Sequence, residues 1–251
     1  MSKSLLLIRL IPNLLTFSAL SIGFSAVRFA LDGSWEKAVW CVILADILDM
    51  LDGRVARFFK VTSSFGVELD SLADLINFGA VPALIIYLWS SSVLINKSSK
   101  ILLWCAGSFY LICAAIRLAK FNLVAHNIRS EEGIRYFFFG VPTSVAAIFA
   151  LVPIVWDFSL RHHFNYSLKG SILLVPYIVF VGILMASRIP TFSLKSVRVS
   201  HEYIWMLLTS FAILIFALVL YPWYLLPICT LLYLISIVFS VIFFDRLKGR
   251  Q

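Results

Sequence analysis

Long hydrophobic stretches alternate with short polar breaks along the whole chain. Each stretch is about 20 residues long, the length that a helix needs to cross the hydrocarbon layer of a bilayer. The apolar residues run continuously within a stretch and do not alternate with polar ones, so helices fit better than the strands of a barrel. We expect about eight spans, over residues 11–30, 36–58, 66–95, 99–125, 140–157, 170–187, 203–221 and 223–245.

Composition strengthens this interpretation. The 251 residues are 61% hydrophobic and only 14% charged, whereas a soluble domain carries about a quarter of charged residues. The sequence contains no soluble domain, no internal repeat and no low-complexity tract. It therefore predicts an all-α integral membrane protein, a bundle of about eight transmembrane helices that forms a single domain over residues 1–251.

The positive charge of the chain indicates an orientation. With an even number of spans both termini lie on one side, and most Lys and Arg residues of the polar breaks fall on that side. Basic loops favour the cytoplasmic side of a membrane. We therefore expect a protein of the cell membrane or inner membrane, with both termini and the acidic stretch described next facing the cytoplasm. The formal net charge of +8 does not indicate nucleic-acid binding, because the basic residues are scattered over membrane loops.

An acidic stretch, DMLDGRVARFFKVTSSFGVELDSLAD, occupies residues 49–74. On a helix of about 100° per residue, one arc of about 140° carries five of its residues. A second helix carries Gly66, Asp70 and Asp74 on one face, and FFKVTSSF between the helices suits a short turn at the membrane surface. The five residues of the first arc are Asp49, Asp52, Gly53, Ala56 and Arg57.

Four aspartates in such a stretch need a partner. Each Asp in the apolar layer costs about 3 kcal/mol, and two carboxylates about 4 Å apart repel by about 4 kcal/mol at an effective dielectric constant of 20. Pairing with Arg54, Arg57 and Lys60 is the alternative for any single Asp, but three bases do not neutralise four acids. Oxygen ligands without His or Cys favour Mg²⁺ or Mn²⁺, and carboxylates from two helices suit two divalent ions.

The stretch also fits a signature, D-x2-D-G-x2-A-R-x8-G-x3-D-x3-D, at every fixed position, and in this it resembles the CDP-alcohol phosphotransferases. These membrane enzymes cleave the pyrophosphate of a CDP-linked lipid, release CMP and join the phosphatidyl group to an alcohol. The resemblance implies that Asp49, Asp52 and Asp70 bind the divalent ions, and that Asp74 helps at the metal site and is the general base. It further implies that CDP is contacted by Gly53, Ala56, Arg57 and Gly66.

Residues outside the signature resemble the phosphatidylserine synthase branch of this family. GVELDSLADLINFG (66–79), RLAKFN (117–122), FFGVPTSVAA (138–147) and SRIPTFSLK (187–195) carry this resemblance, although branch members more often have Ser where Asn77 stands. It implies CDP-diacylglycerol and L-serine as substrates, membrane lipids as surroundings, a catalytic core over about 11–195 and additional helices over about 203–245. The family frequently forms homodimers, so a homodimer is a further expectation.

A serine acceptor carries a carboxylate, which requires a cation. Arg117 lies inside the fourth span, where a charged residue is a candidate functional residue, and Lys120 follows on a neighbouring part of the same face. Pairing of Arg117 with Asp46 and snorkelling of Lys120 are the alternatives. Arg188 and Lys195 are weaker candidates for binding phosphate or a lipid headgroup.

The first span adds two candidates for contact with the nucleotide, Asn13 and Thr16, which share one helix face. Helix capping or an interhelical hydrogen bond is the alternative for Asn13. Asp46 lies one turn before Asp49, outside the signature, and is interpreted either as a residue that orients a ligand or as a hydrogen-bonded membrane acid.

No Ser, Cys or His accompanies the acidic stretch as a nucleophile with a base, so direct attack by the acceptor hydroxyl is preferred to a covalent intermediate. Glycerol 3-phosphate or inositol phosphate is the alternative acceptor, although a phosphate requires more cations than Arg117 and Lys120. A cation transporter is an alternative of another class, but it predicts acids spread over several helices and depths.

Overall fold

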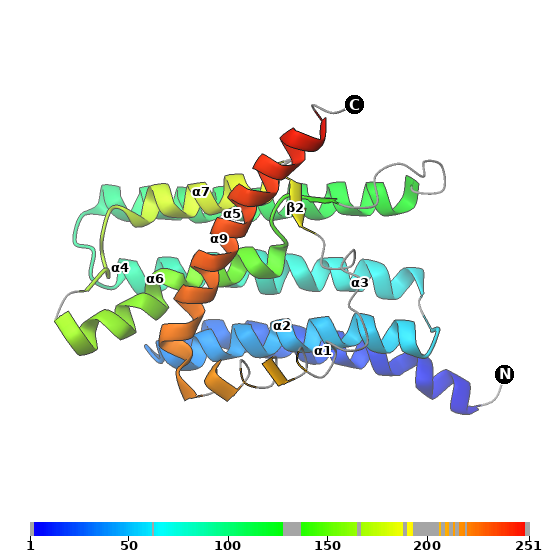
Figure 1. Cartoon of the computed structure of the whole chain (residues 1–251). Helices are drawn as coiled ribbons and strands as arrows, with labels where there is room; N and C mark the ends of the chain where they lie inside the picture. The colour runs from blue at the N-terminus through cyan, green and yellow to red at the C-terminus, as the bar shows by residue number, and fades with distance from the viewer. Residues whose placement is uncertain are drawn as a thin grey trace.

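The computed structural model shows a helical bundle (Figure 1) and describes residues 3–61, 63–127, 137–164, 167–187, 190–192, 206, 209–210, 213, 216–218 and 220–248. A short π-helix, η1, interrupts one of the long helical rods. In chain order the elements are α1 (Lys3–Leu31), α2 (Trp35–Phe58), α3 (Ser64–Asp74), η1 (Leu75–Ala80), α4 (Val81–Ser91), α5 (Lys97–Asn127), β1 (Phe137–Phe139), α6 (Thr143–Phe164), α7 (Leu174–Ala186), β2 (Pro190–Phe192) and α9 (Pro222–Lys248).

Most of the predicted spans coincide with helices. The single span expected over 66–95 is one rod built from α3, η1 and α4, and the spans expected over 36–58 and 223–245 are α2 and α9. The span expected over 203–221 lies largely outside the described residues. Helix formation is therefore confirmed for most of the chain.

By length and apolar composition, three helical stretches of the described part are able to cross a membrane: Leu10–Leu31, Ser64–Ser91 and Lys97–Leu123. Shorter apolar helices cover Thr143–Ser159, Leu174–Ala186 and Pro222–Ile237. At about 1.5 Å per residue α2 is also long enough, but it carries the charged residues of the acidic stretch. The structure is that of a membrane protein, and the count of eight spans stays a prediction.

Local sequence explains where the helices around the acidic stretch begin and end. Phe58 ends α2, and Lys60 then adopts a positive φ of 55° in the turn. The Ser63 hydroxyl caps α3 by accepting a hydrogen bond of 3.0 Å from the Gly66 N–H, which satisfies one of the free donors of the first turn. The short turn expected between the two helices is therefore present, and its place at the membrane surface stays a prediction.

A small β-ladder departs from the all-α prediction. β1 and β2 pair antiparallel, with Phe138 opposite Thr191. Gly140 follows β1 with a φ of +80°, and a Cβ atom there would lie 2.7 Å from the carbonyl oxygen of Met185 and 2.8 Å from that of Ser187. Only glycine allows this close approach between the β1–α6 connection and the end of α7. Three-residue strands carry too little periodicity to be predicted from sequence.

The packing of the bundle matches a lipid environment. Buried side chains, among them Phe78, Trp89 and Tyr110, fill one continuous core, and the Tyr110 hydroxyl donates to the carbonyl of Phe78 in η1 at 2.7 Å. Large apolar side chains such as Phe24 and Leu123 are exposed on the outside. Apolar side chains on both faces of a helix are typical of membrane spans.

The helices lie roughly along one bundle axis, with α9 crossing the others obliquely (Figure 1). α1 packs extensively along α2, and α5 along α7. The beginning of α1 and the turn between α2 and α3 lie at the same end of the bundle, whereas the end of α9 projects from the side of the bundle in the view of Figure 1. The acidic stretch therefore lies toward the end of the bundle where α1 begins.

Candidate active site

Two adjacent helices bring three aspartates together. Asp49 comes from α2, and Asp70 and Asp74 come from α3. One carboxylate oxygen of each residue lies within 4.8 Å of the others, and all three side chains are half-buried. The helical spacing predicted from sequence therefore produces a compact group of carboxylates, which we call the three-Asp cluster.

The remaining aspartate of the signature, Asp52, lies outside this cluster. Asp52 is buried, and its Oδ2 accepts a hydrogen bond of 2.5 Å from the hydroxyl of Thr16 on α1. Asp52 still interacts electrostatically with Asp70. Thr16, a candidate for nucleotide contact, is therefore hydrogen-bonded directly to a carboxylate of the signature.

The three-Asp cluster fits a divalent cation. Asp49 Oδ1 and Asp74 Oδ1 are both buried, and apart from each other's carboxyl group neither has a hydrogen-bond partner among the described residues. Buried carboxylate oxygens are rarely left without a partner, and several of them in one place repel one another. Hard oxygen donors of this kind are the ligands that Mg²⁺ and Mn²⁺ prefer, so the residues present suit the group that the sequence predicts.

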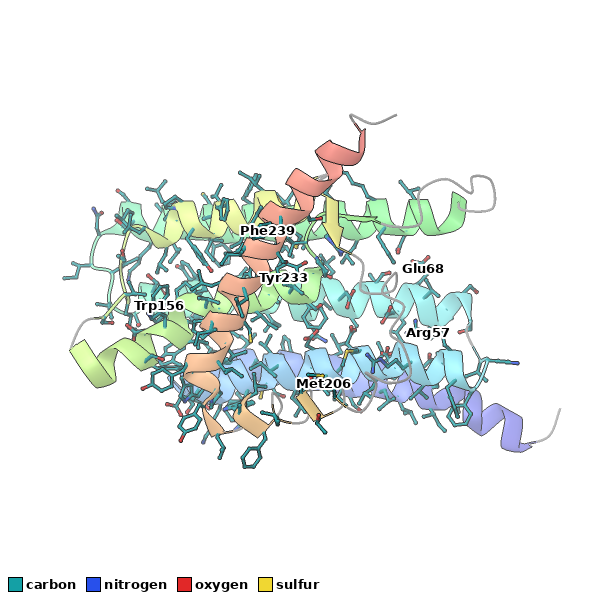
Figure 2. The ribbon with its side chains drawn as sticks, in the orientation of Figure 1. Arg57, Glu68, Trp156, Met206, Tyr233 and Phe239 are labelled. Atoms are coloured by element: carbon teal, nitrogen blue, oxygen red, sulfur yellow. The ribbon has the colours of Figure 1, made fainter. Side chains whose placement is uncertain are left out.

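The other residues of the signature line the same end of α2 and α3. Arg57 is exposed and interacts electrostatically with Asp52 and Asp70, and Ala56 precedes it on α2. A Cβ atom on Gly53 would lie 3.5 Å from the Arg57 guanidinium. Figure 2 shows Arg57 on α2 and Glu68 on α3 toward this end of the bundle.

Asn13 lies beside the start of α3. A Cβ atom on Gly66 would lie 3.2 Å from Asn13 Oδ1 and 3.1 Å from Ser63 Oγ. The absence of a side chain at Gly66 therefore lets α1 approach the capped end of α3. This places Asn13 next to a signature glycine, and its contact with the nucleotide stays a prediction.

Arg117 lies at the depth of the acids. The distance along α3 from Ser64 to Asp74, and along α5 from Arg117 to Asn127, is about 15 Å in each case, and both helix ends point to the same end of the bundle. Arg117 interacts electrostatically with Asp74 and with Tyr233 of α9. Its Nε atom is buried and has no hydrogen-bond partner within the described ranges.

The remaining candidates have other surroundings. Asp46 is hydrogen-bonded to Ser144 of α6, which agrees with the interpretation as a hydrogen-bonded membrane acid and not with pairing to Arg117. Lys120 is exposed and donates a hydrogen bond of 3.3 Å to the carbonyl of Ala186 at the end of α7. Arg188 and Lys195 lie outside the described residues.

Three features of the site were missed by sequence reasoning. The π-helix directly after Asp74 has no local sequence signal, although such segments are frequent at functional sites. Its Asn77 is fully buried, and both polar atoms of the amide lack a partner in the described part of the chain. Tyr233 was missed because its neighbour Arg117 is distant in the sequence, and the bond between Thr16 and Asp52 depends on the packing of α1 against α2.

Comparison with known proteins agrees with the geometry. The profile of the CDP-alcohol phosphatidyltransferase family matches residues 9–184. A CDP-diacylglycerol–serine O-phosphatidyltransferase of Mycobacterium leprae is 32% identical over 235 residues, which are 93% of this chain and 75% of the relative. An enzyme with the same name from Helicobacter pylori (strain ATCC 700392 / 26695) is 36% identical over 191 residues, 75% of this chain and 74% of the relative.

A third relative is an archaetidylserine synthase of Methanothermobacter thermautotrophicus, 33% identical over 140 residues, which are 55% of this chain and 54% of the relative. The family profile covers the whole acidic stretch and Arg117. The resemblance inferred from the signature is therefore confirmed, and an enzyme is favoured over a transporter. The chain belongs to the CDP-alcohol phosphatidyltransferase family and is a membrane-embedded transferase.

Proposed function

We propose that this transferase moves the phosphatidyl group of CDP-diacylglycerol to the hydroxyl of L-serine and releases CMP. The relatives from Mycobacterium leprae and Helicobacter pylori, whose names describe this reaction, support the proposal. The observation that carries it is the three-Asp cluster, with its buried carboxylate oxygens and the Arg117 guanidinium nearby.

The acids suit the first requirement of the reaction, which is to hold a pyrophosphate. Asp49, Asp52, Asp70 and Asp74 are the residues that would hold divalent ions. Bound Mg²⁺ or Mn²⁺ neutralises phosphate oxygens and stabilises the charge that develops on them. Arg57, beside Asp52 and Asp70, adds a fixed cation that the chain itself supplies.

The nucleotide end of the donor fits beside the start of α3. Gly53, Ala56 and Gly66 leave room for close approach of the CDP moiety, and Asn13 offers an amide next to Gly66. Thr16 is buried and bonded to Asp52, so it contributes by orienting that carboxylate. A direct nucleotide contact from Thr16 is the alternative that the sequence left open.

Asp74 acts on the acceptor. The serine hydroxyl oxygen attacks the phosphatidyl phosphorus, and its proton passes to the Asp74 carboxylate. The new phosphorus–oxygen bond forms as the bond from this phosphorus to the oxygen of CMP breaks. General-base assistance of this kind contributes about 10²–10⁴-fold to the rate, and attack is direct, without a covalent enzyme intermediate.

Arg117 holds the other end of the acceptor. Its guanidinium offers a fork of donors that matches a carboxylate, and it lies close enough to Asp74 for the two charges to interact. Lys120 and Arg188 are weaker candidates for this role, since the Lys120 ammonium already donates to Ala186. A serine molecule would then have its hydroxyl at Asp74 and its carboxylate at Arg117.

The same proposal extends to the whole chain. Residues of about 11–195 form the catalytic core of a single domain, and the helices after about 203 are additions to it. The site and both termini face the cytoplasm, where water-soluble serine and CMP are exchanged. The excess of Lys and Arg in the polar breaks on that side supports this orientation.

A direct assay tests the proposal. Purified protein in detergent is supplied with CDP-diacylglycerol, Mg²⁺ or Mn²⁺ and labelled L-serine, beside parallel reactions with glycerol 3-phosphate and inositol phosphate. We expect labelled lipid and stoichiometric CMP with serine alone, and loss of both on addition of EDTA. Transfer only to a phosphate-bearing acceptor would overturn the serine assignment.

A further inference from the structure

A hydrogen-bonded pair of side chains joins the helix that carries two of the acids to the helix that carries Arg117. Asn122 of α5 donates from Nδ2 to Ser71 Oγ of α3 at 3.1 Å, and Asn122 Oδ1 lies 3.3 Å from the same oxygen. Ser71 Oγ also donates to the carbonyl oxygen of Val67, one turn earlier in α3, at 3.1 Å. A hydroxyl has a single proton, so the Asn122 amide supplies the donor that links the two helices.

Ser71 lies beside the acids on α3. It directly follows Asp70 and precedes Asp74 by three residues, so the Ser71 and Asp74 side chains are about 60° apart around the helix. Ser71, Asp74 and Asn122 are all half-buried. Residues within one helical turn move together. Any displacement of Ser71 relative to α5 therefore displaces both acids by a similar distance.

Close packing of the two helices does not fix this distance. In the described part of the chain, α5 packs extensively along α7 and closely on η1, and α3 packs on α1 and leads into η1, but α3 and α5 are not a closely packed pair. Close packing of side chains normally determines how neighbouring helices lie. Where two helices lack it, a hydrogen bond between their side chains contributes more to their spacing.

We propose that Asn122 is a positioning residue, whose bond to Ser71 sets the distance between the acids of α3 and an acceptor held on α5. The inference rests on the proposed function and deepens it, because in that function the acceptor hydroxyl reaches Asp74 while the acceptor carboxylate binds Arg117. A displacement of about 1 Å costs up to about 100-fold in rate. Metal and donor are held by α2 and α3, so the bond should affect transfer to the acceptor and not the binding of metal or CDP-diacylglycerol.

The test is a double-mutant cycle of Ser71→Ala and Asn122→Leu in the full-length enzyme. Asn122→Leu keeps much of the side-chain shape and removes both polar atoms. Each single variant should lower kcat for transfer to serine about tenfold, and the double variant should lose no more than either, because all three lack the same bond. The KM for CDP-diacylglycerol and the Mn²⁺ concentration for half-maximal activity should stay within about twofold of wild type. Ser71→Thr keeps the hydroxyl and should keep kcat.

Ser108→Ala is the matched control, because the Ser108 hydroxyl donates to the Trp104 carbonyl within α5 at 3.0 Å, as Ser71 does to Val67 within α3; it should leave every constant unchanged. Additive losses in the cycle, or a kcat of Asn122→Leu within twofold of wild type, overturn the inference. So does a rise in the KM for CDP-diacylglycerol together with a lowered thermal midpoint, since that pattern indicates general loosening of the bundle. If the wild-type enzyme transfers only to another acceptor, the proposed function fails, and the same cycle, followed by CMP release with that acceptor, still decides the role of Asn122.

Discussion

The two sides of the candidate site are encoded in different ways. On the acid side, the signature residues lie within one stretch, 49–74, on two helices joined by a short turn. On the acceptor side, Arg117 lies on α5, and its neighbour Tyr233 lies on α9, far away in the chain. The first arrangement follows from helical periodicity, and the second exists only once α9 has packed across the bundle.

This difference decides what each side tolerates. Side chains on a regular helix keep their mutual spacing whenever the helix forms, so the acids are positioned by local structure. Arg117 and Tyr233 keep their spacing only while distant helices remain packed. Substitutions on the acid side should therefore abolish chemistry without unfolding the protein, whereas substitutions on the acceptor side should change which substrate is used.

The largest effect is expected on the acid side. Asp74→Asn removes the proposed base and should lower the transfer rate by about 10³-fold, while CDP-diacylglycerol still binds in the presence of the metal. CMP release measures the first quantity, and protection against thermal unfolding by the lipid measures the second. Glu68→Gln, an exposed acid of the same helix, is the control and should stay near wild type. Turnover of Asp74→Asn within tenfold of wild type would remove Asp74 from the base role.

The next effect separates the two cations of α5. Arg117→Gln should lower kcat/KM for serine by about 100-fold, the loss typical when one partner of a buried charged contact is removed. Lys120→Gln should have little effect, because that ammonium is exposed and bonded to Ala186. Steady-state kinetics with varied serine and fixed CDP-diacylglycerol give both values. A larger loss in Lys120→Gln than in Arg117→Gln contradicts the assignment of the acceptor carboxylate to Arg117.

Features that depend on local sequence were predicted, and features that depend on contacts between distant helices were not. Continuous apolar runs predicted the helices, because their length and composition are local properties. The spacing of Asp70 and Asp74 predicted that they share one face of a helix, and the short turn between α2 and α3 predicted that Asp49 of the preceding helix lies near them. The separation of Asp52 from that cluster was not predicted, because its direction is set by a hydroxyl of another helix, that of Thr16.

The features that were not predicted all depend on contacts between distant segments. The ladder of β1 and β2 requires the carbonyls of Met185 and Ser187 to lie over Gly140. The π-helix after Asp74 is held in part by Tyr110, whose hydroxyl bonds a carbonyl of that segment. The residues next to these positions in the sequence do not show which distant segment determines their conformation.

The third prediction tests the packing that the acceptor side requires. Gly140→Ala places a Cβ atom 2.7 Å from Met185 O at a φ of +80° and should lower the free energy of unfolding by about 2–3 kcal/mol. Gly33→Ala is the matched control, because Gly33 has a φ of +73° but nothing within 4 Å of the added atom. It should cost only about 1 kcal/mol. Denaturation in detergent measures both, and equal losses would show that backbone strain, not the close approach, makes Gly140 necessary.

The smallest effect concerns the hydrogen bond from the Thr16 hydroxyl to Asp52, which links α1 to a carboxylate of the acidic stretch. Thr16→Val keeps the shape of the side chain and removes the hydroxyl, so Asp52 loses its orienting donor. We expect the Mn²⁺ concentration for half-maximal activity to rise about tenfold, as for other groups that orient metal ligands, and Mn²⁺ to give less thermal protection. Thr16→Ser restores the hydroxyl and should restore both values. If the KM for CDP-diacylglycerol rises while the Mn²⁺ dependence is unchanged, Thr16 contacts the nucleotide. In that case the hydroxyl of α1 binds substrate and does not orient the Asp52 carboxylate for the metal.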